Sequence, residues 1–443
     1  MQKVKLRKVK LVAAALVLSA LSLTLGCTKR EAQAPREALH LDLEMSAAEI
    51  LQAVENQTGS AKNPNELDQT VADNGRAELK EVLDSGARLY SWLELLNSKR
   101  TDGTKLSFTS KETQAAYPID AVRPYNIAII KAQYADRLAV SPASLKAILL
   151  SADPLPETLP TDEATFIKWG HEISASYDIA VRWVSLIGDI QYYKRNQAND
   201  LRGYYFLSRM ADRDAKLKDF AAQPAASQAS IREWLTQICM NNQDWSDINR
   251  QRCVDEVAAA VTANSLVDYY AKDAPGSAEL WASYFDIRSY YMRSDLTWTA
   301  AEPNVLHYPF LQPTTAPIQS YLKDNVEDEF KTSTWHLAID YQTVEKPGLS
   351  HFEFAAGENA HAVPAKSLIV MDANQPISEY DSQWTIRHEF GHLLGFPDCY
   401  VEFYDESIQA MVNYQLDTTN LMCSRRGKFQ DQHFDRLKTA YLK

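Results

Sequence analysis

The residues best suited to chemistry in this chain form the pattern H-E-x-x-H: His388, Glu389 and His392. Histidines four residues apart on a helix lie on one face, so their imidazole nitrogens can bind one metal ion. Asp398 follows shortly after and offers a carboxylate oxygen as a third ligand. Three protein ligands leave the fourth position of a zinc ion open, as in catalytic sites. The sequence therefore predicts one zinc ion per chain.

Glu389 has a different predicted role from the two histidines. It lies about 100° around the helix from His388, where it reaches a water on the metal without binding the ion itself. Zinc lowers the pKa of such a water towards ~7, and a nearby carboxylate can take its proton as the oxygen attacks a peptide carbonyl. The same carboxyl group can then protonate the leaving amine. We therefore expect Glu389 to act as the general base in peptide hydrolysis.

These side chains require a helix that ends close to the metal. Residues 378–381 have the pattern of a capping box, which predicts a helix from there to about Leu394. The face opposite the metal-binding residues is apolar and should be buried in a core. Its residues are Ile386, Phe390, Leu393 and Leu394.

Two glycines complete the local pattern. Gly391 has no side chain, so another segment can approach the helix closely there. Gly395 suits the left-handed turn that ends a helix, and this turn would bring Asp398 back towards the histidines. The combined pattern arises by chance in a chain of this length with a probability on the order of 10⁻⁵.

The motif resembles H-E-x-x-H-x-x-G-x-x-H/D, the signature of the metzincin clan of zinc peptidases. The aspartate variant looks most like the small secreted bacterial metzincins of the snapalysin type. The resemblance covers residues 330–443, and its specific motifs only residues 388–423. It implies a zinc peptidase domain that aligns its peptide substrate along an edge strand.

Metzincins also have a methionine in a tight turn beneath the metal, and two methionines are candidates here. Met422 follows an Asn-Leu pair, as in related Met-turns, and adjoins Cys423. These two features favour Met422 over Met411. Ser424 stands where some subfamilies have a tyrosine that reaches the metal. Three other tyrosines are candidates for the same role: Tyr400, Tyr404 and Tyr414.

Two other histidines, His351 and His361, flank a predicted edge strand. A second, structural metal site there is one interpretation. We favour surface positions for both, because no aspartate or glutamate accompanies them at a recognisable ligand spacing.

Four of the five cysteines fall into two sequence-local pairs, as an oxidising compartment favours. Cys239 and Cys253 flank a polar turn, so a disulfide between them would link a helical hairpin. Cys399 and Cys423 adjoin the third metal ligand and Met422, two segments that the metzincin resemblance implies lie close together. The alternative is four buried free thiols.

The N-terminus has the features of a bacterial lipoprotein signal. Basic residues within 1–10 precede an uncharged apolar run over 11–25 that is too short for a comfortable membrane span. Gly26 and Cys27 resemble a lipobox, whose cysteine becomes the lipidated first residue. We expect a signal peptide over 1–26, a tether over 27–44, and a lipid anchor in the outer membrane of the cell envelope. An uncleaved N-terminal anchor is the alternative.

Composition and net charge indicate a folded protein and argue against a nucleic-acid-binding one. The chain has 443 residues, of which 45% are hydrophobic, and this is typical of a folded protein with two or three domains. Its net charge of −12 opposes binding to nucleic acid phosphates. We therefore expect no nucleic acid partner.

The hydrophobic pattern changes near residue 298. Helical periodicity dominates residues 45–297, for example in the stripe of Ile127, Ile130, Tyr134 and Leu138. Beyond it, a helix is predicted over 318–330, and strands over 335–341, 350–355 and 367–372. The predicted fold is multidomain: an α-helical domain of unknown role over 45–297, then an α+β metzincin-like catalytic domain over 298–443.

These observations favour a zinc-dependent endopeptidase tethered to the cell envelope, with a protein or peptide substrate. The alternative is a non-catalytic envelope lipoprotein with a structural metal site, whose helical domain binds a partner. Glu389 favours the enzyme, because a structural site needs no base beside its first ligand. A third hypothesis keeps the enzyme and makes the helical region an inhibitory prodomain.

Overall fold

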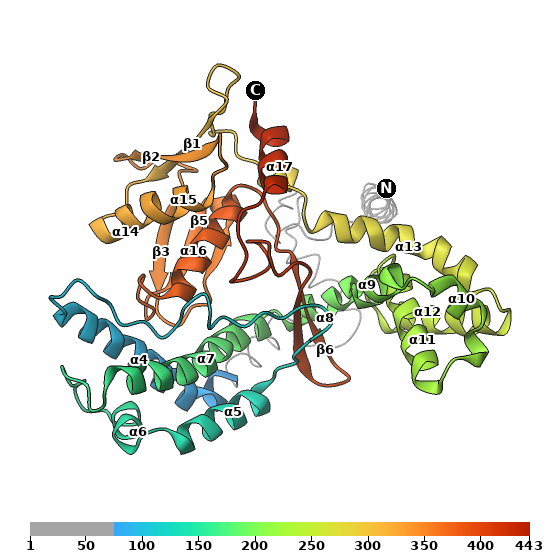
Figure 1. Cartoon of the computed structure of the whole chain (residues 1–443), viewed down its shortest axis with the longest axis horizontal. Helices are drawn as coiled ribbons and strands as arrows, with labels where there is room; N and C mark the ends of the chain where they lie inside the picture. The colour runs from blue at the N-terminus through green and yellow to red at the C-terminus, as the bar shows by residue number, and fades with distance from the viewer. Residues whose placement is uncertain (1–74) are drawn as a thin grey trace, which may run out of the picture.

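The computed structural model describes residues 75–443. The predicted signal peptide, Cys27 and the tether lie outside the described residues. Within the described part of the chain, no helix has the length and apolar character needed to cross a bilayer. Helices make up the first part of this chain, and three small sheets with further helices make up the rest (Figure 1).

Four helices of the N-terminal part share one hydrophobic core. They are α4 (Lys80–Lys99), α5 (Ile127–Val140), α6 (Ala143–Leu149) and α7 (Glu163–Ile187). The predicted apolar stripe lies on α5, where Ile130, Tyr134 and Leu138 are buried. This part of the sequence prediction is confirmed, since residues at helical spacing face one core.

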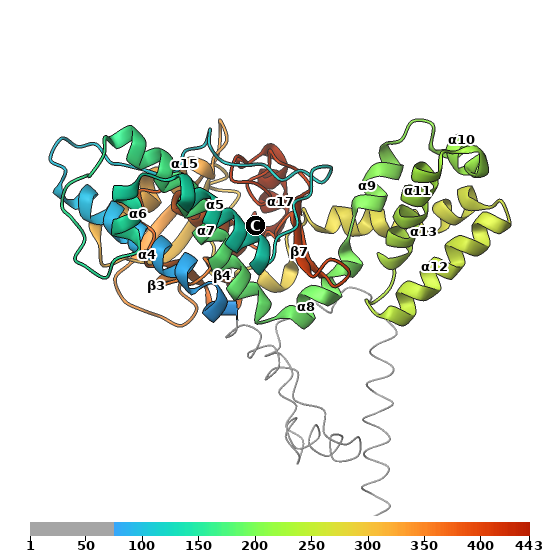
Figure 2. The ribbon, with the colours of Figure 1, turned by 90° about the horizontal axis from the view of Figure 1, so that it is seen from below.

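A second helical lobe has a core of its own. Short helix α8 (Ile190–Arg195) leads towards it, and Figure 2 shows the lobe projecting from the rest of the molecule. Its helices are α9 (Arg202–Arg209), α10 (Arg213–Lys218), α11 (Ala225–Met240), α12 (Asp247–Thr262) and α13 (Leu266–Ser283). The Cys239–Cys253 disulfide links α11 to α12, as predicted. The helical region thus has two cores, and its boundary at residue 297 stays a prediction.

Five strands of the C-terminal part lie next to one another. They are β1 (Val305–Leu311), β2 (His336–Gln342), β3 (His351–Ala355), β4 (His361–Val363) and β5 (Leu368–Asp372). β1 pairs parallel with β2, and β5 pairs parallel with β3 and antiparallel with β4. A single parallel bridge between Phe310 and Ser350 links β1 to the residue before β3, so the two-stranded sheet β2-β1 lies beside the three-stranded sheet β3-β5-β4.

The predicted strands correspond to β2, β3 and β5 within one residue, whereas β1, β4 and the two strands of the later hairpin over 400–415 were not predicted. Pro309 interrupts the sequence signal of β1, because proline lacks a backbone N–H and is rare inside sheets. It is tolerated here because the connection to β3 uses the N–H of Leu311, which donates to the Ser350 carbonyl at 2.8 Å, and not the proline nitrogen.

The predicted helix over 318–330 is present but irregular. It consists of α14 (Ala316–Tyr321), a π-helical turn over Leu322–Val326 and the short α15 (Glu327–Glu329). The remaining elements are α16 (Tyr380–Leu393), the hairpin of β6 (Tyr400–Asp405) and β7 (Ala410–Gln415), and α17 (Asp431–Tyr441). The mixture of helices with small sheets agrees with the predicted α+β architecture.

An extended segment between α4 and α5 connects the helical part to the C-terminal part. Tyr125 exchanges two backbone hydrogen bonds with Met411 of β7, and Gln415 donates its backbone N–H to the carbonyl of Tyr117. The hairpin β6–β7 therefore pairs with a segment almost 300 residues earlier in the chain. The two parts of the chain are interlocked through backbone contacts as well as side chains.

Candidate metal centre

Helix α16 carries the H-E-x-x-H residues against the sheet core. Its apolar face is buried as predicted, and Phe390 packs on Tyr308 and Phe330 with ring centroids 4.5 and 5.7 Å apart. The predicted capping box is wrong. The N-cap is Glu379, whose buried carboxylate accepts the Phe108 N–H at 3.0 Å and forms no cap bond. A tertiary partner has replaced the local one.

The structure brings His388, His392 and Asp398 together. The Nε2 atoms of His388 and His392 lie 2.9 and 3.1 Å from Oδ1 of Asp398, and 3.1 Å from each other. One donor atom from each residue therefore lies within 4.8 Å of the other two. Such a set of two imidazole nitrogens and one carboxylate oxygen can hold a metal ion.

Backbone carbonyls fix the direction of both imidazoles. Nδ1 of His388 lies 3.1 Å from the carbonyl oxygen of Leu421, and Nδ1 of His392 lies 2.7 Å from that of Phe396. An Nδ1–H that donates to a carbonyl leaves the Nε2 lone pair free for a metal. These two carbonyls were not predicted, because a backbone acceptor has no signature in the sequence.

Gly395 ends the helix in the predicted left-handed conformation, with a φ of +94°. Its N–H donates to the carbonyl of His392 at 2.9 Å, and the next N–H donates to the carbonyl of Gly391 at 3.1 Å. Arg288 donates its own N–H to the Gly395 carbonyl at 2.8 Å. The turn is thus held from both sides, and it returns the chain to place Asp398 at the histidines.

Met422 lies beneath α16 at the position of Gly391. A Cβ added to Gly391 would lie 2.4 Å from the Met422 sulfur, so the missing side chain is what allows the approach. The Cys399–Cys423 disulfide joins the ligand loop to this segment, with the two Cα atoms 4.6 Å apart. Met411 is fully buried in the core of the first helical cluster instead.

Glu389 lies beside the triad and not within it. Its carboxylate Oε2 is 3.9 Å from Nε2 of His392, and the residue is only 6% exposed. Burial raises the pKa of the Glu389 carboxyl. The two histidines and a backbone hydrogen bond from Ala362 of β4 act in the opposite direction but do not cancel this shift. The structure thus places a buried carboxylate next to the candidate ligands and next to an edge strand.

Within the triad, the protonation states of His392 and Asp398 depend on each other. Burial disfavours the charged form of His392, but the carboxylate of Asp398 outweighs it and raises the pKa of His392 to about 9. Burial likewise disfavours ionised Asp398, yet the two histidines hold its pKa well below the usual range. The Asp398 side chain is 38% exposed, so solvent reaches the triad at this residue.

The three candidate tyrosines have different surroundings. The Tyr400 ring stacks on His388 with centroids 6.2 Å apart. The Tyr414 hydroxyl donates to Asp200 at 2.9 Å, and Tyr404 packs on Trp183. Among the three, Tyr400 is therefore the one in contact with a candidate metal ligand.

Comparisons of the chain with protein-family models, with curated proteins and with solved structures gave no match.

Neither His351 nor His361 belongs to a group with metal-like spacing in the part of the chain that the structure describes. Nδ1 of His351 and of His361 lie against the carbonyl oxygens of Leu349 and Asn359. Among the described residues, one further group has metal-like spacing, Cys239 with Glu256 and Asp273, but its sulfur is in a disulfide. The triad is therefore the best candidate for a metal centre in residues 75–443.

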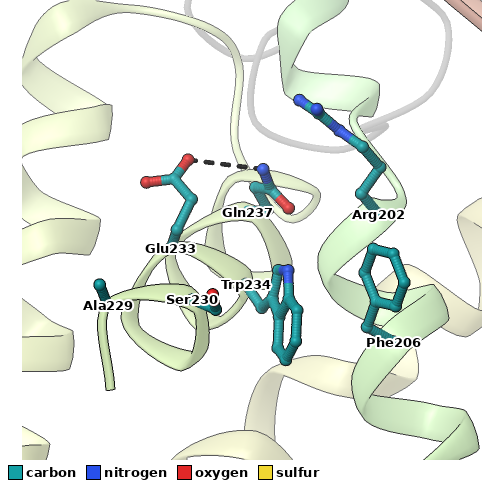
Figure 3. A pocket seen from close by; sticks show the side chains of 7 residues that line it. All are labelled: Arg202, Phe206, Ala229, Ser230, Glu233, Trp234 and Gln237. Carbon is teal, nitrogen blue, oxygen red and sulfur yellow. Dashed lines mark hydrogen bonds between the residues drawn. The ribbon is translucent and has the colours of Figure 1, made fainter. Parts of the chain in front are cut away.

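A cavity of about 380 Å³ lies apart from the triad, between α9 and α11 of the second helical lobe (Figure 3). Phe206 and Trp234 stack there with ring centroids 5.0 Å apart, and Gln237 donates to Glu233. The cavity contains none of the residues predicted to form a site.

Proposed function

We propose that this protein is a zinc-dependent endopeptidase whose ligands are His388, His392 and Asp398. The observation that carries the proposal is the convergence of their three donor atoms, with the Glu389 carboxylate 3.9 Å from one of them. The donor set fits zinc, which binds imidazole nitrogen and carboxylate oxygen. Both imidazoles are already oriented by hydrogen bonds at Nδ1.

The proposed reaction is hydrolysis of a peptide bond. The oxygen of water bonds to the carbonyl carbon, the C–N bond breaks, and the amine leaves with a proton. Zinc, when bound, supplies a Lewis acid and lowers the pKa of water. Glu389 takes the proton from the attacking water and delivers it to the amine. Burial raises the pKa of this carboxyl, which makes the carboxylate a stronger base.

Strand β4 supports an extended peptide as the substrate. It pairs with β5 on one side and forms the antiparallel edge of its sheet. Its Ala362 also forms a backbone hydrogen bond to Glu389, so the edge lies next to the proposed base. An extended peptide that adds to this edge, in place of the Ala362–Glu389 hydrogen bond, would pass the metal centre. This is the arrangement that the metzincin resemblance implies for residues 330–443.

The ligand count supports a catalytic rather than a structural metal. The group at the centre consists of three residues, whereas structural zinc sites are usually closed by four. Asp398 is also reached by solvent, which a substrate site requires. These features favour the enzyme over a non-catalytic lipoprotein with a structural metal.

Attachment to the cell envelope through Cys27 remains part of the proposal. The two disulfides support an oxidising compartment, as expected for an exported protein. Replacing Cys27 with serine should release the protein from the membrane fraction of its host cell. Retention of the variant in that fraction would contradict a lipid anchor at this residue.

A peptide library tests the proposed activity directly. The purified protein should cleave internal peptide bonds, lose this activity to a zinc chelator and regain it when zinc is restored. Mass spectrometry of the products would also show which residues flank the cleaved bond. Cleavage that survives complete removal of metal would contradict the proposal.

A further inference from the structure

Arg182 of α7 connects the helical region to the strand that follows the third metal ligand. Its Nη2 lies 2.7 Å from Oε2 of Glu402 on β6, and its Nε lies 3.0 Å from Oε1 of the same residue. The Glu402 side chain is 6% exposed and that of Arg182 is 28% exposed, so the carboxylate of this two-point ion pair is largely excluded from water. The Glu402 carboxylate also accepts the Tyr125 hydroxyl at 3.0 Å and the Asn413 amide at 3.1 Å.

The same guanidinium group contacts Tyr400. Its Cζ lies 5.5 Å from the centroid of the Tyr400 ring, and Nη2 is 3.4 Å from the hydroxyl oxygen. Residues two apart on a strand point to the same face, which explains how one arginine reaches both Tyr400 and Glu402. The Tyr400 ring in turn stacks on the imidazole of His388. A continuous series of contacts therefore runs from α7 to a candidate metal ligand.

Strand β6 also begins two residues after Asp398. A displacement of β6 would shift the Tyr400 ring relative to His388 and change where the ligand loop ends. Without the guanidinium group, Glu402 would be a buried carboxylate with no opposite charge, and a buried charge without its partner drives local rearrangement. Two of the three candidate ligands, His388 and Asp398, are thus linked to Arg182 through β6.

We propose that Arg182 is a positioning residue of the metal centre, and that the helical region is a permanent part of the peptidase and not a removable prodomain. This inference rests on the proposed function, since it concerns the same metal.

The test compares three variants of the full chain. Arg182→Met removes the charge, and Arg182→Lys keeps it without the two-point contact. Arg137→Met is the matched control, because Arg137 of α5 pairs with Glu172 at 3.3 Å inside the same helical cluster. Zinc affinity is measured by competition with a chelator, and the ligand geometry by the visible spectrum of the cobalt-loaded protein. Melting temperature is recorded for each variant.

We expect Arg182→Met to weaken zinc binding by about tenfold or more, as loss of groups that orient metal ligands does, and to change the cobalt spectrum. Arg182→Lys should show a smaller change in both. Arg137→Met should lower the melting temperature and leave both metal readouts at their wild-type values.

A folded Arg182→Met with wild-type zinc affinity and cobalt spectrum would overturn the inference. If that variant does not fold, Arg182→Lys decides in the same way. Wild-type protein that binds no zinc would overturn the proposed function as well, so the two failures are distinguishable.

Discussion

The sulfur of Met422 lies directly against Gly391, so close that an added Cβ would be 2.4 Å from it. Gly391 is between Glu389 and His392 on α16, and Met422 is next to the cysteine that joins this segment to the ligand loop. The Met422 segment beneath the helix and the loop that carries Asp398 are therefore covalently connected. A substitution that displaces the Met422 segment should change the metal centre.

Gly391→Ala should destabilise the protein by about 1–3 kcal/mol, the usual cost of overpacking a filled core. The cause is the contact with Met422, so the same substitution should cost less when Met422 is already alanine. Chemical denaturation of the two single variants and the double variant measures this coupling. An equal cost of Gly391→Ala in both backgrounds would show that Met422 is not the obstacle.

Loss of the Cys399–Cys423 disulfide should lower both stability and zinc affinity. The bond closes a loop of about 25 residues, which stabilises by ~3.5 kcal/mol on the chain-entropy model. Without the bond, the ligand loop and the Met422 segment can separate. The paired substitutions Cys399→Ala and Cys423→Ala, followed by chelator competition and thermal melting, measure the two effects.

Cys239 and Cys253 provide the matched control for that experiment. Their disulfide links α11 to α12 in the second helical lobe, away from the triad. Replacing both with alanine should lower the melting temperature without changing zinc affinity. A loss of zinc affinity in this variant would contradict the separation of the lobe from the metal centre.

His433 should make the protein less stable in weak acid. The residue is 4% exposed, its Nδ1 accepts the Gln430 N–H at 2.9 Å, and its Nε2 donates to Asn420 at 3.0 Å. Burial lowers the pKa of His433 to about 4, against about 6.5 when unfolded. Between pH 6.5 and pH 4 the unfolded chain binds one proton more than the folded protein does. The free energy of unfolding is therefore highest above pH 6.5 and decreases as the pH falls towards 4.

The size of this effect is about 3 kcal/mol across that range. His433→Gln removes the titration, so the variant should be less stable at pH 7 but should change less between pH 7 and pH 4. Denaturant unfolding at both pH values measures the difference. A variant with the same pH dependence as wild type would rule out His433 as the source.

His392→Ala should abolish stoichiometric zinc binding, because it removes one of three ligands. The control is His361→Ala, which removes an exposed histidine whose Nδ1 lies against the Asn359 carbonyl. Elemental analysis should find one zinc per chain in the wild type and in this control. Equal zinc content in His392→Ala would contradict the ligand assignment.

Local features of the site could be predicted from the sequence because they depend on spacing within a single helix and turn. The buried face of α16 and the positive φ of Gly395 are of this kind. The N-cap of α16 could not be predicted, because Glu379 is engaged by Phe108, a residue 271 positions away. The same holds for Arg182 and Glu402, which meet only in the folded chain.

Strand β1 and the two helical cores show a related limit. Pro309 carries a local signal against a strand, and the sheet overrides it because the neighbouring residues Tyr308 and Phe310 are fully buried.

Helical periodicity identifies residues that face a core but does not indicate which core. The separation of the helical region into two cores therefore followed only from the tertiary contacts.

The most direct test of the central claim is the turnover of Glu389→Gln at a matched zinc content. The variant should fold, hold one zinc per chain and lose peptide cleavage by about 10²–10⁴-fold, because glutamine cannot accept the proton of the attacking water. A folded, zinc-loaded Glu389→Gln that cleaves peptides at the wild-type rate would contradict the proposed function.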